Sequence, residues 1–115
     1  MPVTTELHAR LDELTAALTV IEAARYARDY PDSPIEPDVV VWKERSKYIA
    51  IDFERPQNSG YGGSGAWLVD KATGELYNIH GYGKPDINKK RKADLGNVYS
   101  VDPAWLHARR HNYLR

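Results

Sequence analysis

The chain has 115 residues and a mass of 13.1 kDa, which is enough for one domain with its own hydrophobic core. It contains no cysteine, so disulfides, thiolate metal sites and a cysteine nucleophile are excluded. Its Lys+Arg and Asp+Glu counts are equal, and no apolar run approaches the roughly 20 residues of a membrane-spanning helix. We therefore expect a soluble, cytoplasmic protein with one domain over residues 1–115.

The zero net charge conceals an uneven distribution along the chain. Residues 1–83 carry eight Lys/Arg against thirteen Asp/Glu, a net charge of −5, whereas residues 84–115 carry eight against three, a net charge of +5. Such a division is typical of a protein that contacts an acidic partner or a nucleic acid through its basic part. Attraction between the two parts, within one molecule or between copies, and a solvated basic surface without a ligand are the alternatives.

A long helix is predicted over residues 5–29. Its apolar side chains recur at intervals of four and three residues and form one stripe: Leu7, Leu11, Leu14, Leu18 and Ile21. Thr4 or Thr5 can cap the start of this helix, and prolines at positions 31 and 34 end it. Two heptads are too few to predict a coiled coil, so we expect the stripe to pack on a sheet.

Four strands are predicted within residues 39–80. Residues 39–44 and 47–54 are rich in β-branched and aromatic side chains and are two residues apart, which indicates an antiparallel pair whose Ile49, Ile51 and Phe53 face the core. Residues 66–70 and 75–80 flank a turn in which Asp70 can accept hydrogen bonds from backbone amides and Gly74 can adopt a left-handed conformation. The four strands form an antiparallel meander, with the first helix on one face.

The last part of the chain, residues 84–115, is predicted to contain a basic loop and a short helix. Residues 98–101 can add a short edge strand. Asp102 and Pro103 are typical of a helix N-cap and first helical position, and they predict a helix through Trp105 to Tyr113. The predicted fold class is therefore α+β, with an N-terminal helix packed on a four-stranded antiparallel meander and a short C-terminal helix.

Known catalytic and metal-binding patterns are incomplete in this sequence. Residues 60–65 match G-x-G-x-x-G, but a predicted strand follows them where a dinucleotide-binding site needs a helix. His107 and His111 have the spacing of two metal ligands, but zinc ordinarily takes at least three, so we interpret them as surface histidines. No metal or cofactor is predicted. A small hydrolase-like enzyme centred on His80, with Asp52 and a serine, is a third hypothesis.

A basic, tyrosine-bearing surface is the best candidate for function. The predicted binding residues are Tyr61, Tyr82, Lys84, Lys89, Lys90, Arg91, Lys92, Arg109 and Arg110. The two tyrosines are flanked by glycines, and they either pack over those glycines or present a contact surface to a protein. The alternative is direct binding of DNA or RNA, with the lysines and arginines on phosphates and Tyr82, Tyr99, Tyr113 and Trp105 stacked on bases.

Two segments, GAWLVDKATGELY at residues 65–77 and GYGKP at residues 81–85, combine a strand, an Asp-x-x-Thr-Gly-Glu turn, a second strand ending in aromatic residues and a basic segment after a proline. With these features, residues 47–97 resemble small uncharacterised proteins encoded by phages of actinobacteria. The resemblance implies a phage or mobile-element accessory protein in the cytoplasm of the host cell. Its partner would be a host protein or another phage protein, and no catalytic motif is transferred.

Overall fold

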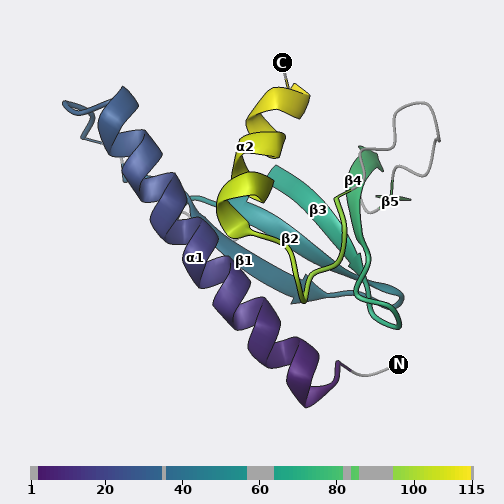
Figure 1. The fold of residues 1–115 in the computed structure, drawn as a ribbon. Coiled ribbons are helices and arrows are strands. Elements are labelled where there is room, and N and C mark those ends of the chain that lie inside the picture. The colour runs from purple at the N-terminus through teal and green to yellow at the C-terminus, as the bar shows by residue number, and fades with distance from the viewer. Residues whose placement is uncertain (1–2, 35, 57–63, 82–83, 86–94, 115) are drawn as a thin grey trace.

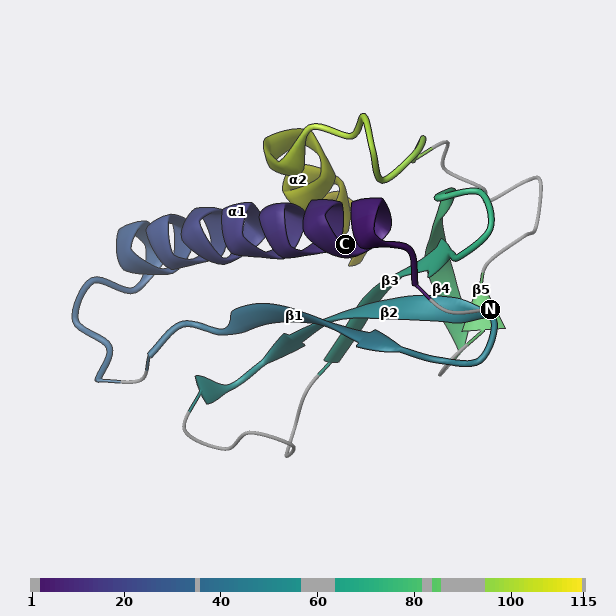
Figure 2. The same ribbon diagram turned by 90° about the horizontal axis from the view of Figure 1, so that it is seen from below.

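The computed structural model describes residues 3–34, 36–56, 64–81, 84–85 and 95–114 (Figure 1). Its elements are α1 (Thr5–Asp29), β1 (Val39–Glu44), β2 (Tyr48–Glu54), β3 (Ser64–Asp70), β4 (Leu76–Gly81), β5 (Lys84–Pro85) and α2 (Pro103–Leu114). The strands form one sheet in the order β1-β2-β3-β4-β5, with every neighbouring pair antiparallel. Figure 2 shows both helices on the same face of this sheet. The predicted α+β fold and its meander are confirmed, and the two-residue β5 extends the sheet by one edge strand.

Helix α1 begins and ends as its sequence predicts. The Thr4 hydroxyl accepts a hydrogen bond from the Leu7 backbone amide at 3.1 Å, which satisfies one of the amides that have no partner within the helix. Four leucines of the stripe are fully buried, whereas Ile21 is half-buried. The stripe therefore faces the sheet along most of the helix and leaves the core near its last turns.

The core lies between α1 and the helix-facing side of the sheet. The register aligns Ile51 of β2 with Trp42 of β1 and Trp67 of β3, and side chains alternate between the two faces along each strand. Phe53 and Trp67 are buried with their ring centroids 6.0 Å apart. The hydrophobic cluster comprises Leu7, Leu11, Leu14, Leu18, Val40, Ile49, Ile51, Phe53, Trp67, Val69, Leu76, Leu95, Val98, Val101 and Leu106.

The turn between β3 and β4 has the predicted chemistry. Asp70 Oδ1 accepts hydrogen bonds from the backbone amides of Ala72 at 2.8 Å and Thr73 at 3.2 Å. Gly74 has a φ of 79°, a left-handed conformation that side chains disfavour. A Cβ on Gly74 would also lie 3.0 Å from atoms of the Asn97 and Tyr99 side chains. This glycine thus permits both the turn and the close approach of the segment before α2.

The segment over residues 95–101 is a strap that crosses from the β4 side of the sheet to α1, not the predicted edge strand. Only Asn97 forms a β-bridge, with Glu75, and the chain then turns over residues 98–100. Leu95, Val98 and Val101 are buried by this turn. The turn is favoured over a strand because it directs all three apolar side chains into the core. An extended backbone would place Val98 on the side opposite Leu95 and Val101.

Arg10 of α1 fastens the strap. Its Nε donates to the Val98 carbonyl at 2.7 Å and its NH2 donates to the Val101 carbonyl at 2.8 Å, while NH1 bonds Glu13. The guanidinium therefore links the first helix to a turn about 90 residues later in the chain. Hydrogen bonds to a charged donor of this kind are stronger than those between neutral groups.

Replacing Arg10 with methionine should destabilise the fold by about 1.5–3 kcal/mol, because two carbonyls lose their charged donor while the aliphatic packing is kept. Urea unfolding followed by circular dichroism measures this loss. Arg28→Met is the matched control, since the Arg28 side chain lies on α1 and is 75% exposed. Equal stability losses in the two variants would contradict a specific role for Arg10.

Candidate functional site

Helix α2 presents an aromatic and a cationic side chain side by side. It begins at Pro103, and Asp102 accepts a hydrogen bond from the Ala104 amide at 3.2 Å, as the Asp-Pro pair predicts. Trp105 is 42% exposed, and the guanidinium carbon of Arg109 lies 5.5 Å from its ring centroid. Positions four residues apart share one side of a helix. We call Trp105, Ala108 and Arg109 the α2 surface.

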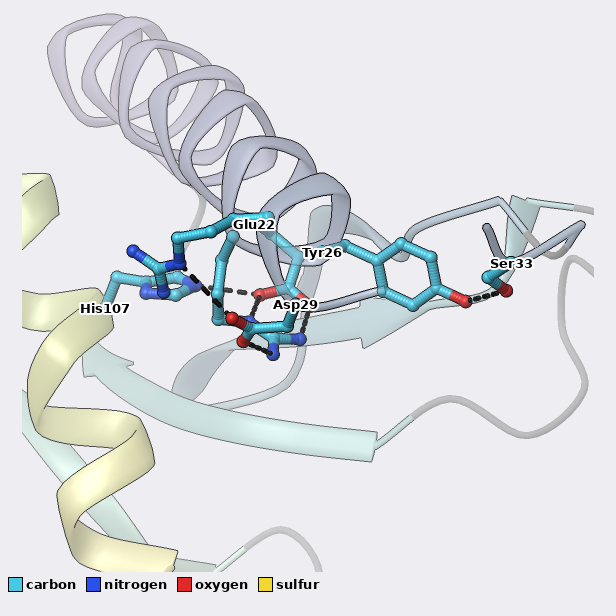
Figure 3. Close-up of polar contacts among 7 residues, drawn as sticks. Glu22, Tyr26, Asp29, Ser33 and His107 are labelled. Atoms are coloured by element: carbon cyan, nitrogen blue, oxygen red, sulfur yellow. Dashed lines mark hydrogen bonds and ion pairs between the residues drawn. The ribbon is translucent and has the colours of Figure 1, made fainter. Parts of the chain in front are cut away.

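The opposite side of α2 is anchored in the core. Leu106 is fully buried, and His107 next to it is 5% exposed. The His107 ring contacts Phe53 of β2, with 6.3 Å between centroids. Its Nε2 lies 2.8 Å from Glu22 Oε1 of α1 (Figure 3). Because these contacts hold one side of the helix, they fix which way the α2 surface points.

A network of charged groups surrounds the Glu22 carboxylate. Arg25 binds both of its oxygens, with Nε 3.1 Å from Oε1 and NH2 2.8 Å from Oε2. Its NH1 donates a further hydrogen bond to Asp29 Oδ2 at 3.2 Å. Beyond it, the hydroxyls of Tyr26 and Ser33 lie 2.7 Å apart and join α1 to the segment between α1 and β1, which we call the connector (Figure 3). Burial acts to raise the pKa of Glu22, but hydrogen bonds and charges from Arg25 and His107 outweigh it, so the pKa lies below its ordinary value.

The interpretation of His107 as a surface histidine is wrong. A histidine beside two arginines on a short basic helix is typical of a solvated position. Its burial is favourable here because the fold supplies a carboxylate from a residue 85 positions away in the chain. Local spacing carries no signal of such a partner. The side chain of His111 lies outside the described residues.

Most of the predicted binding residues lie outside the part of the chain that the structure describes: Tyr61, Tyr82, Lys89, Lys90, Arg91 and Lys92. Lys84 lies in β5, where its backbone is opposite Gly81, and Arg110 lies in α2, but the side chains of both are outside the description. Arg109 is therefore the predicted residue whose surroundings are known. Trp105 belongs beside it, although its exposure could not be predicted from the sequence.

The described residues leave the enzyme hypothesis untested, because its central group is the side chain of His80. Asp52 is half-buried on the helix-free face of β2, and its burial raises the pKa of its carboxyl. The side chain of His80 lies outside the description, and Ser100 is exposed in the strap. Within the described ranges, no three His, Asp or Glu side chains are grouped as metal ligands need to be. Neither helix, as far as it is described, has the length and apolar character needed to cross a bilayer.

The Glu22 network predicts an acid-sensitive contribution to stability. Because the folded-state pKa of Glu22 is lower than its ordinary value of 4.5, the contribution is present above that value and is lost as the pH falls through the folded-state pKa. Urea unfolding between about pH 6 and pH 3 should show a smaller fall in stability for Glu22→Gln than for the parent chain. Glu36→Gln, at an exposed position of the connector, is the control. A fall of the same size in Glu22→Gln and the parent would contradict the prediction.

Comparisons with known proteins leave the α2 surface to be interpreted from its own residues. No protein-family model matches the sequence, and no curated protein or solved structure matches the chain. The exposure, charge and packing of these residues are therefore the evidence on its function.

Proposed function

We propose that the chain is a non-enzymatic binding module that docks on another protein through a basic, aromatic-bearing surface centred on α2. The observation that carries this proposal is the exposed Trp105 with Arg109 over its ring. Tryptophan and arginine dominate the residues whose removal costs most at protein interfaces. An exposed indole also leaves apolar area in water, and covering it with a partner recovers roughly 25 cal/mol for each Å².

The rigidity of the support favours the same function. Leu106 and His107 hold α2 against α1 and β2, so the α2 surface does not have to be ordered when the partner arrives. A surface that is already in its bound conformation avoids the entropic cost of immobilising side chains.

Charge indicates the kind of partner. Residues 84–115 carry eight Lys/Arg against three Asp/Glu, a net charge of +5. A basic surface attracts an acidic one and suppresses binding to basic proteins. In the phage setting that the resemblance implies, the partner is an acidic surface of a host or phage protein, and Tyr61, Tyr82 and Lys89 to Lys92 add to the contact.

Direct binding of DNA or RNA is the competing function, because a tryptophan beside an arginine can also stack on a base. The two differ in salt dependence. Each phosphate contact releases counterions and makes nucleic-acid affinity fall steeply with salt. The acid-rich first part of the chain and the sequence pI of about 6.9 favour a protein partner over nucleic acid.

Photocrosslinking from position 108 tests the proposal. Ala108 is exposed on the α2 surface, so a benzophenone side chain there should capture a protein from a nuclease-treated host lysate. Trp105→Ala and Arg109→Ala should each reduce capture at least about tenfold, because both are expected to be central contacts. Tyr30→Ala is the control, since Tyr30 is an exposed aromatic residue beyond the end of α1.

Three outcomes would contradict the proposed function. Capture that requires intact nucleic acid would favour the competing function. Capture that survives both substitutions on α2, or that Tyr30→Ala abolishes equally, would show that another surface binds the protein. Absence of any crosslinked protein from the natural host would leave the module without a partner.

A further inference from the structure

A pair of tyrosines lies on the face of the sheet opposite the helices. Tyr48 of β2 is aligned with Asp70 of β3, and Tyr77 of β4 is aligned with Leu68 of β3. These residues share one face because the buried Ile49 and Val69 between them point to the helix side. The two rings belong to strands on either side of β3, and their centroids are 6.3 Å apart with an angle of 82° between the planes.

Two carboxylates give the tyrosine pair a negative surrounding. Asp70 lies between Tyr48 and Glu75 in the register, since its backbone amide bonds the Glu75 carbonyl at 2.9 Å. Glu75 Oε2 accepts a hydrogen bond from the Tyr77 hydroxyl at 2.7 Å. The hydrogen bond to Glu75, burial and the negative charges of Glu75 and Asp70 raise the pKa of Tyr77 to about 12. Both carboxylates therefore act on the Tyr77 hydroxyl.

A cation of the chain itself already lies on one ring of this aromatic pair. The Lys47 ammonium is 5.5 Å from the centroid of the Tyr48 ring, within the distance of about 6 Å at which a cation is attracted to a ring face. Lys47 is exposed, in the short turn between β1 and β2. An exposed lysine side chain keeps much of its rotamer freedom in solution, so another ammonium group can take its place at little cost.

We propose that Tyr48, Tyr77 and Asp70 form a binding site for the lysine side chain of a partner protein, in which Lys47 occupies the place of the ligand while the site is empty. The aromatic faces would contact the methylene groups and the ammonium, and Asp70 and Glu75 would supply the opposite charge. A trimethylated lysine would bind more tightly than an unmodified one, because its weaker hydration lowers the cost of bringing it onto the rings. The site is separate from the α2 surface, which lies on the helix side of the sheet (Figure 2).

The test uses three small probes that share one backbone and one aliphatic chain and differ in the group at its end. Acetyl-lysine methylamide, its trimethyl form and the neutral acetyl-norleucine methylamide are titrated into isotope-labelled protein, and amide and tyrosine ring shifts are followed by NMR. We expect saturable shifts at Tyr48 and Tyr77 with the two charged probes, tightest for the trimethyl form, and none with norleucine. Equal binding of the neutral probe, or shifts that do not saturate, would overturn the proposal.

Two lysine variants test the competition without disturbing the aromatic pair. Lys47→Ala should tighten binding of the trimethyl probe about threefold or more, because a competing cation is removed. Lys43→Ala is the control, because it also removes one positive charge from the same face. The Lys43 ammonium is paired with Glu54 at 2.5 Å, so its removal should change the affinity much less. An equal gain in both variants would indicate a general field effect and would overturn the proposal, as would weaker binding to Lys47→Ala.

Replacing Tyr48 tests whether an aromatic ring is needed for binding. Tyr48→Leu should weaken the trimethyl probe at least about threefold, since the leucine keeps apolar cover over the sheet but has no aromatic face. The variant's amide spectrum shows whether it is folded. Undiminished binding to a folded Tyr48→Leu would mean that the rings only cover Leu68, and the site would not exist.

Discussion

Burial of the α1 leucine stripe against the sheet is the interaction on which the rest of the structure depends. Leu7, Leu11, Leu14 and Leu18 are fully buried against a cluster that includes Ile51 and Trp67. Each such leucine contributes about 1.5–3 kcal/mol relative to an exposed one, so the four together contribute more than the Arg10 contacts with the strap. Once α1 lies across the sheet, its side chains supply the positions to which the strap and α2 attach.

That attachment uses charged groups as well as apolar ones. Arg10 holds the strap through two carbonyls, and Glu22 holds α2 through His107. Burying an ion pair such as Glu22 and His107 costs desolvation energy that often cancels its attraction, so we expect this pair to orient α2 more than to stabilise the fold. These contacts join the strap and α2 to defined residues of α1, and Trp105 and Arg109 lie on the side of α2 opposite His107.

The two candidate surfaces are opposite in charge and lie on opposite sides of the sheet. On the helix side, α2 combines an exposed indole with a guanidinium, and on the helix-free side a tyrosine pair is surrounded by Asp70 and Glu75. A module built in this way can contact an acidic and a basic surface at the same time, because neither site blocks the other.

Local sequence determined the helices, the strands, the β3–β4 turn and the leucine stripe, because periodicity, the Thr4 and Asp102 caps and Gly74 act within a few residues. It also indicated a basic end of the chain. Only the tertiary structure decided that His107 is buried, that residues 98–101 turn into the core, and that Tyr48 meets Tyr77 across β3. Each of these depends on partners between 29 and 91 positions apart, which sequence spacing does not encode. Packing of α1 on the sheet brings the first two sets of partners together, and pairing of β2 and β4 with β3 brings the tyrosines together.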